Sequence, residues 1–570
     1  MKVKKKENKR EKKIKKKKKN FLTTSFSLAG KYIKEKYPFL LLFFFGFLLL
    51  GSINLLKVST SNSVAGFNLQ DFEIGQIADR TIIAERTLPP DAIDTVVVQN
   101  GEKVIKKGFP ITEEGYAKLR KMSLSPVVVD YRAFANNLLY LFLVAIAWYL
   151  LYTFLNFGRK IKVREPLVQV ILLLILYSAA TFSSRFPFFA NPFTVSILIP
   201  TGLCVMLITI LYGELSAILF SFISSLAIIV ACGWVLPPAL FTISSSLCAV
   251  TIVRRISRRL DLVFASIILS FFDVIMMLFL LLIFNEEVAK NGMIFVGIFL
   301  NGFLSGILTL GFLTPLEFML NSASVFRLMD LCDQNNPLMQ KMLITASGTY
   351  NHSLMVAQLA ESACREIGAN PLIARVGAYY HDIGKIDQSE YFVENQKGQN
   401  KHDDINPSLS ASIIKSHVKK GVEKARELHL PQVIIDVISE HHGNSVIAYF
   451  YNEAKEKDPT VAQEDYSYPG NPPSSKESAV VMLADTVEAA CRTLENPSVS
   501  RLEKFITQLV NSKMDHKQLD NCELTFKDIT KIKQAFVQIL VGYYHSRIEY
   551  PDQVDPDQKE NHSKEEKKDS

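Results

Sequence analysis

The sequence GTYNHSLMVAQLAESACREIGANPLIARVGAYYHDIGK, residues 348–385, decides the fold of the second half of the chain. Its first part repeats apolar residues at the spacing of a helix, which Gly368 is placed to end. Asparagine and proline then follow in the order preferred at a helix N-cap and first turn, so a second helix is expected to end near His381-Asp382. The stretch therefore predicts two consecutive helices, with His352 on the first.

Three more helices are expected further along, at about 408–418, 431–442 and 477–494. Strand-like alternation is almost absent after Leu320, so this half is predicted to be all-helical. The five helices carry a set of imidazoles and carboxylates: His352, His381, Asp382, His417, His441, His442 and Asp485.

This ordered set favours a metal site, although any one of its members has an ordinary explanation as a core or surface residue. Imidazoles and carboxylates without thiolates suit Fe, Mn, Co or Zn. Seven protein ligands are too many for one ion and about right for two. The seven cysteines of the chain form no CxxC pair, so neither a disulfide framework nor a zinc signature is expected. The other histidines are expected at the surface: His402, His429, His516, His545 and His562.

The first half of the chain is dominated by long apolar runs between about residues 37 and 315. The first run, PFLLLFFFGFLLLGSINLL (38–56), approaches the roughly 20 residues that a spanning helix needs. More than thirty residues precede it and no cleavage site follows, so it is interpreted as an uncleaved signal anchor. Seven further runs are predicted to cross the membrane, at about 134–156, 166–183, 194–211, 214–234, 238–253, 262–284 and 292–314.

Positive charge indicates the orientation of these crossings. Residues 1–20 hold thirteen Lys/Arg and two Glu, a net +11 against +8 for the whole chain, so the rest of the chain is slightly acidic. Beside a membrane helix such a run marks the cytoplasmic side more often than a nucleic-acid site. With a cytoplasmic N-terminus, eight crossings place the basic loops 158–164 and 254–259 inside. The polar segment 57–133 then lies outside, with a hairpin expected around Asn100-Gly101.

Several motifs together resemble the seven-transmembrane HD phosphodiesterases that hydrolyse cyclic di-AMP. The HD superfamily carries the pattern H…HD…D, and a subgroup with additional histidines binds a second metal. The resemblance covers the second half nearly end to end, and the order of anchor, external segment, seven helices and HD domain also agrees. The motifs are RLMDLCDQNNPLMQKMLITASGTYNHSLMVAQLAESA, AYYHDIGK, YFVENQ, NPSLSASIIKSHVKKG, ISEHHGNS and YPGNPPSSKESAVVMLADTVEAACR.

The resemblance assigns roles to individual residues. It implies one metal held by His352, His381, Asp382 and Asp485, and a second held by His417, His441 and His442, with Asp382 as the bridge. The two ions are expected to be Fe or Mn. They could share a hydroxide and stabilise an in-line displacement. Lys385 is expected either to neutralise charge in the transition state or to act as an ordinary cation at a helix C-terminus. Substrate binding is assigned to Lys385, Tyr391, Asn395 and Asn406.

The predicted function is that of a membrane-bound phosphodiesterase converting cyclic di-AMP to pApA. Hydrolysis of cyclic di-GMP or guanosine tetraphosphate is an alternative, and so is a membrane receptor that binds a nucleotide without turnover. The expected partners are the cyclic dinucleotide and the lipid bilayer, with an extracytoplasmic ligand and a homodimer as further options and no nucleic acid. In sum, an all-α, multi-pass plasma-membrane protein is expected, with these parts: a basic cytoplasmic tail (1–36), a signal anchor (37–56), a short extracytoplasmic segment (57–133), a seven-helix membrane block (134–316), a cytoplasmic HD domain (317–551) and a disordered tail (552–570).

Overall fold

The computed structural model describes residues 37–545 with short gaps at 57–66, 68, 85–86, 91–94, 125–130, 155–162, 184–185, 190, 289–291, 397, 399 and 495–496. The chain divides into two compact units, residues 1–313 and 314–570. The predicted N-terminal and C-terminal tails, 1–36 and 552–570, lie outside the described residues.

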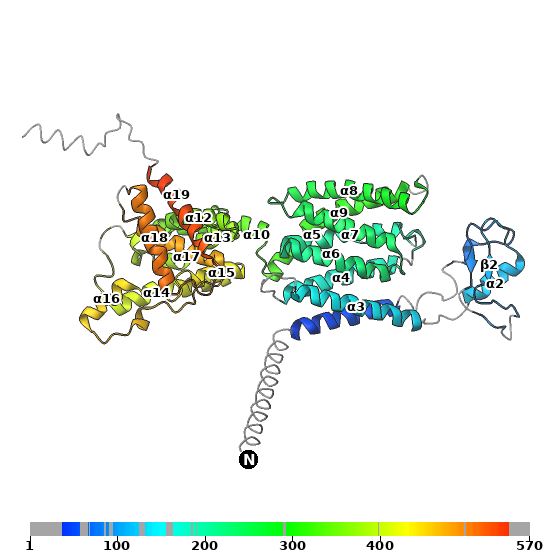
Figure 1. Cartoon of the computed structure of the whole chain (residues 1–570), viewed down its shortest axis with the longest axis horizontal. Coiled ribbons are helices and arrows are strands. Elements are labelled where there is room, and N and C mark those ends of the chain that lie inside the picture. Colours follow the sequence, from blue (N-terminus) through cyan, green and yellow to red (C-terminus); the bar gives the residue numbers. More distant parts are fainter. Residues whose placement is uncertain are drawn as a thin grey trace, which may run out of the picture. The chain divides into compact units, whose positions relative to one another are not determined.

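Within the described residues, seven helices are long and apolar enough to cross a membrane. All lie in the first unit, except that the last of them continues past its end at residue 313. Figure 1 shows these helices aligned side by side, as expected of a bundle in which every backbone amide is bonded within its own helix. They are Tyr37–Leu56, α3 (Tyr131–Phe154), α4 (Arg164–Ser183), α6 (Glu214–Ala231), α7 (Leu236–Val253), α8 (Asp261–Ile283) and α9 (Gly292–Leu320).

The predicted crossing at 194–211 is not one continuous helix. It is divided into a 3-10 turn, η3 (Thr194–Ile197), and a helix of 12 residues, α5 (Thr201–Tyr212), with Pro200 as the N-cap of α5. The break is stabilised by α9, because Asn301 Nδ2 donates to the carbonyl oxygens of Ile197 at 2.7 Å and Ile199 at 3.0 Å.

The segment 194–212 nevertheless returns the chain to the side of the bundle where α4 begins. The hydroxyl of Tyr212, at the end of α5, donates to the carbonyl of Arg164, at the start of α4. Ser216, at the start of α6, donates to the carboxylate of Glu165. The order of turns predicted from the sequence therefore holds, although α5 by itself is shorter than a bilayer-spanning helix.

The segment between the first two apolar helices contains a small folded domain. Its described elements are η1 (Leu69–Asp71), β1 (Ile82–Ile83), β2 (Lys103–Ile105) and α2 (Glu113–Leu124). The expected hairpin around Asn100-Gly101 was wrong, because β2 pairs antiparallel with the more distant β1 and Val98 bridges to Leu88. The reason lies in packing: Val98 and Leu119 are buried in one core with Ile82.

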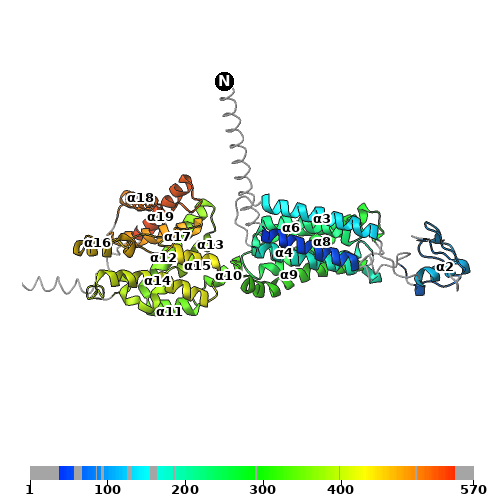
Figure 2. The ribbon, with the colours of Figure 1, turned by 90° about the horizontal axis from the view of Figure 1, so that it is seen from below.

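The second unit is helical throughout its described residues, as predicted. Figure 2 shows α12 and α17 in its centre, with α18 and α19 on one side and α11 and α14 on the other. Residues 478–485 of α17 are all buried, which explains why the middle of that helix, residues 479–484, is apolar on every face. The elements are α10 (Val325–Leu331), α11 (Pro337–Thr345), α12 (Ser347–Ile367), α13 (Pro371–Tyr380), η5 (Ile383–Tyr391), η6 (Val393–Asn395), α14 (Pro407–Glu427), α15 (Gln432–Glu440), α16 (Ala448–Lys457), η7 (Gln463–Tyr466), α17 (Lys476–Cys491), α18 (Val499–Asp515) and α19 (Phe526–His545).

Local signals in the sequence correctly set the ends of the first helices around the site. Gly368 ends α12 with a φ of 69°, a left-handed conformation that glycine adopts without strain. Asn370 caps α13 by accepting hydrogen bonds from the amides of Leu372 and Ile373. These two caps fix the orientation of α13, whose last turn leads into His381.

A buried arginine joins the end of α9 to the helices of the second unit. Arg327 is 7% exposed, and its guanidinium donates to the carbonyls of Glu317 at 2.9 Å and Ser322 at 3.1 Å. It also donates to the carbonyl of His429, in the turn between α14 and α15. One side chain thereby satisfies acceptors from two separate parts of the fold.

We expect Arg327→Met to lower the free energy of unfolding of this unit by about 2–4 kcal/mol, because three backbone carbonyl groups, including the buried one of Glu317, lose a charged donor. The matched control is Arg365→Met, since Arg365 is 69% exposed and pairs with Glu361 on the surface of its own helix. That change should cost less than about 0.5 kcal/mol. Thermal unfolding of the full-length protein in detergent measures both, and equal midpoint shifts for the two variants would contradict the assignment.

Candidate metal centre

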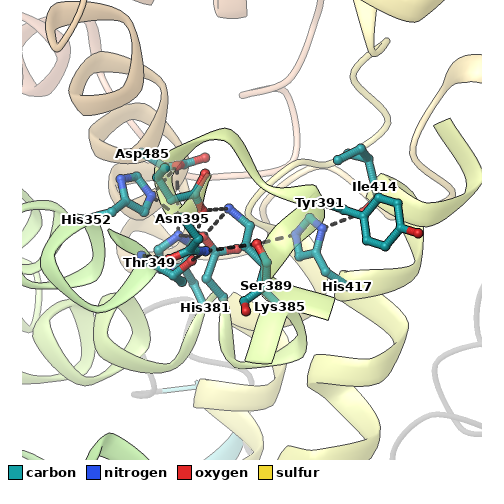
Figure 3. A network of polar contacts seen from close by, with 12 residues as sticks. Thr349, His352, His381, Lys385, Ser389, Tyr391, Asn395, Ile414, His417 and Asp485 are labelled. Carbon is teal, nitrogen blue, oxygen red and sulfur yellow. Dashed lines mark hydrogen bonds and ion pairs between the residues drawn. The ribbon is translucent and has the colours of Figure 1, made fainter. Parts of the chain in front are cut away.

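The seven predicted side chains lie together in the second unit. Figure 3 shows four of them, His352, His381, His417 and Asp485, close together with Lys385. The prediction that all seven lie on helices was wrong for four: His381, Asp382, His441 and His442 occupy the turns directly after α13 and α15. These two helices end at the centre, so turn residues after α13 and α15 face it together with His352, His417 and Asp485 from α12, α14 and α17.

The carboxylate of Asp382 lies between two groups of histidines. Its Oδ2 is 3.2 Å from Nε2 of His381 and 3.7 Å from Nε2 of His352. Its Oδ1 is 3.4 Å from Nε2 of His417 and 3.8 Å from Nε2 of His441. This division of the two oxygens is the geometry expected of a carboxylate that serves two ions.

Asp485 has a similar position from the other side. Its Oδ1 is 3.0 Å from Nε2 of His352, and its Oδ2 is 3.7 Å from Nδ1 of His442. The described residues contain three overlapping groups that could hold a metal ion, and the ligand atoms of each group lie within 4.8 Å of one another. The groups are His352, His381 and Asp485; His381, Asp382 and His441; and His417, His441 and His442.

The residues present fit metal ions. Nε2 of His381 and Oδ1 of Asp382 are buried and have no hydrogen-bond partner within the described part of the chain. Unpartnered buried polar atoms are costly, and each such atom in a native protein requires an explanation. A cation between imidazole nitrogens and carboxylate oxygens would supply that explanation, and the donor set is one that Fe, Mn and Zn accept.

Backbone carbonyls orient three of the imidazole rings. Nδ1 of His381 donates to the carbonyl of Ala378 at 2.7 Å, and His441 does the same to Ile438 at 2.8 Å. His417 donates to Ile414 at 2.6 Å, a contact visible in Figure 3. These bonds leave the Nε2 lone pairs directed at the centre, as in known metal-binding histidines.

The other two rings are held differently. Nδ1 of His352 is hydrogen-bonded to the carboxylate of Glu488, which follows Asp485 on α17 by almost one turn. His442 stacks on the ring of Tyr468 at 4.3 Å and directs Nδ1 to the centre. Neither Glu488 nor Tyr468 was identified from the sequence, although the spacing of three residues after Asp485 was a usable signal for Glu488.

The charge states agree with these orientations. Burial lowers the pKa of His417 to about 4 and that of His441 to about 3, so both rings are neutral. Burial disfavours the charged carboxylate of Asp382, but His381 and Lys385 outweigh it and hold its pKa well below the usual value. Burial also lowers the pKa of His352, yet hydrogen bonds to Asp485 and Glu488 raise it to about 10. An ion at His352 therefore displaces a proton.

Lys385, the predicted catalytic cation, lies at the centre. Its Nζ is 2.6 Å from Oδ2 of Asp382 and 3.0 Å from Oε1 of Glu394. Glu394 in turn accepts a hydrogen bond of 2.9 Å from the hydroxyl of Thr349. The ammonium group is therefore fixed beside the Asp382 carboxylate by a partner that the sequence did not indicate, Glu394.

The three further residues expected to bind substrate have contacts elsewhere and do not line the cavity beside the centre. Asn395 accepts a hydrogen bond from the amide of Thr349 and donates to its hydroxyl. Asn406 caps α14 by accepting from the amide of Leu409. Tyr391 packs on His402 at 5.6 Å.

One of the histidines expected at the surface was placed wrongly. His402 is 9% exposed, and its Nε2 donates to the carbonyl of Tyr391 at 2.8 Å. Its ring also packs against Phe450. The carbonyl partner belongs to a turn eleven residues away, which no local pattern could reveal.

Close backbone contact brings α14 to the turn that carries Asp382. A Cβ atom on Gly384 would lie 1.8 Å from the carbonyl oxygen of His417 and 2.6 Å from the amide nitrogen of Gly421. Only glycine permits this approach, which sets His417 beside Asp382.

A cavity of about 890 Å³ opens beside the centre, a size typical of ligand sites. Its wall combines candidate metal ligands, aromatic rings and cations. They include His352, His417, His442 and Asp485 with Lys385, Phe392, Tyr468, Arg492 and Lys513.

Two family models match the chain. Residues 134–324 match the family described as 7TM receptor with intracellular HD hydrolase, and residues 349–490 match the HD domain. The chain is 32% identical to the cyclic-di-AMP phosphodiesterase PgpH of Bacillus subtilis over 82% of its own length and 67% of that protein. It is 33% identical to PgpH of Listeria monocytogenes over 83% of its length and 66% of that protein, so it spans about two thirds of these relatives.

A solved structure is also similar to part of the chain. The crystal structure of the L. monocytogenes PgpH HD domain in complex with cyclic di-AMP is 44% identical, covering 38% of this chain and 100% of that one with a TM-score of 0.36.

We expect the purified full-length protein to carry two transition-metal ions per chain and Asp382→Ala to lose both, because this carboxylate faces both histidine groups. The control is Asp387→Ala, five residues away, whose carboxylate is half exposed and pairs with Lys424. Mass spectrometry of the bound metals measures the content, and circular dichroism checks the fold. A folded Asp382→Ala protein that retains two ions would refute the bridging role.

Proposed function

This chain belongs to the family of the cyclic-di-AMP phosphodiesterase PgpH, and on that premise we propose that it hydrolyses cyclic di-AMP to the linear dinucleotide pApA. The observation that carries the proposal is the position of Asp382, with one oxygen towards His352 and His381 and the other towards His417 and His441. The cavity beside it has room for a nucleotide ligand.

Two divalent transition-metal ions, Fe or Mn, are part of this proposal. His352, His381, Asp382 and Asp485 would hold one, and Asp382, His417, His441 and His442 would hold the other. When bound, such a pair would lower the pKa of the attacking water and stabilise charge on the entering and leaving oxygens.

The side chains around the centre supply the rest of the chemistry. Lys385 places a positive charge beside Asp382, where it would stabilise negative charge that develops on the phosphate. Glu394 keeps this ammonium in place, and Phe392 lies under it at 4.9 Å. Tyr468, buried against His442, excludes water from one side of the centre.

The assay uses the full-length protein in detergent with Mn²⁺ and follows the nucleotides by chromatography. We expect conversion of cyclic di-AMP to pApA, and a fall of at least about a hundredfold for Asp382→Ala. Asp387→Ala serves again as the control and should retain activity. Cyclic di-GMP and guanosine tetraphosphate are assayed in parallel. With two ions bound, a failure to turn over cyclic di-AMP would refute the proposed substrate.

The location proposed for this site is the cytoplasmic face of the plasma membrane. Arg164, at the start of α4, and Arg254, at the end of α7, flank turns on the side where α6 begins, since Arg254 pairs with Glu214 at 2.8 Å. Lys/Arg-rich turns face the cytoplasm, which supports a cytoplasmic N-terminus and HD domain. An extracytoplasmic ligand and a homodimer stay predictions.

Cysteine labelling tests this orientation. A maleimide that cannot cross membranes should label Glu286→Cys, in the turn after α8, in intact cells. Ser257→Cys, in the turn before α8, should be labelled only after the cells are permeabilised. Both positions are exposed, and the unchanged chain gives the background. The reverse pattern would invert the topology.

A further inference from the structure

The three lysine or arginine side chains that line the described part of the cavity differ in their partners. Lys385 pairs with two carboxylates, Asp382 and Glu394. Arg492 pairs with Glu488 at 2.7 Å. Lys513 forms no ion pair within the described part of the chain, and its Nζ donates to the hydroxyl of Ser445 at 3.1 Å.

The position of Lys513 makes this lack of a counter-ion costly. Its side chain is partly buried, and burial lowers its pKa although the Asp485 carboxylate opposes the effect. The hydroxyl of Ser445 satisfies one N–H but carries no charge. An ammonium group withdrawn from water is stabilised by an anion, and the space that it faces is the ligand cavity.

Lys513 comes from a part of the fold that contributes no candidate metal ligand. It lies on α18, and its partner Ser445 follows His442 by three residues. A cyclic dinucleotide carries two phosphodiester groups in one ring, and only one of them can lie at the metal centre. The candidate ligands and Lys385 account for that group, which leaves the second phosphate without a partner among them.

We propose, on the basis of the function proposed above, that Lys513 binds the second, uncleaved phosphate of the cyclic dinucleotide. Lys513 is then a specificity-determining residue, since it favours substrates with two phosphates over simple phosphodiesters.

The test compares two substrates in the full-length protein with Mn²⁺. Lys513→Met should raise the KM for cyclic di-AMP about tenfold or more, because one charge-assisted hydrogen bond is lost, with a smaller change in kcat. Hydrolysis of bis(p-nitrophenyl) phosphate, which has a single phosphate, should change less than about twofold. Lys513→Arg should restore most of the affinity. The matched control is Lys504→Met, an exposed position on the same helix.

A binding measurement separates this inference from the proposed activity. Isothermal titration of the metal-stripped protein with cyclic di-AMP should show the same loss of about tenfold in affinity for Lys513→Met, without any turnover. If the unchanged chain binds cyclic di-AMP but does not cleave it, the proposed function fails while the binding loss still supports Lys513. An equal loss with both substrates, or no loss of binding in Lys513→Met, would overturn the inference.

Discussion

A negative charge buried at the junction of several helices is the constraint on which the second unit depends. Asp382 is 1% exposed, and burying a carboxylate without compensation costs several kcal/mol. The fold compensates by ending α13 and α15 at this point and by placing Lys385 in contact with the carboxylate. Rings held by their own helix backbones complete the surroundings. The candidate metal centre and the arrangement of the helices therefore depend on each other, because the helix ends supply the groups that surround the buried charge.

Local signals predicted much of this arrangement. Helical periodicity and the caps at Gly368 and Asn370 set the helices, and the ordered histidines and aspartates did converge in space. What failed depended on partners distant in sequence. The burial of His402 arises from a carbonyl in another turn, and Asn395 fastens a loop to the start of α12. The sequence alone does not distinguish an Asn or His side chain that binds a ligand from one that links two segments of the fold.

The membrane half shows the same difference between pattern and packing. Hydropathy found the apolar runs correctly, but an average over such a run does not register the interruption at Pro200. The structure tolerates this break because the Asn301 side chain, on the neighbouring helix α9, donates to two carbonyls beside it. In the second unit Arg327 has a comparable role, supplying donors where α9 ends and where α14 turns into α15. In both places one polar side chain connects segments about a hundred residues apart.

The contact of Gly384 with α14 has a consequence for the two halves of the centre. It joins main-chain atoms to main-chain atoms, so no change of side-chain rotamer can lengthen or shorten it. The distance between His417 and Asp382 is thus set by the backbone positions of the two segments. The methyl group of an alanine at position 384 would force these two backbone segments apart. It would move His417 away from Asp382, so that this one carboxylate would no longer face both groups of histidines.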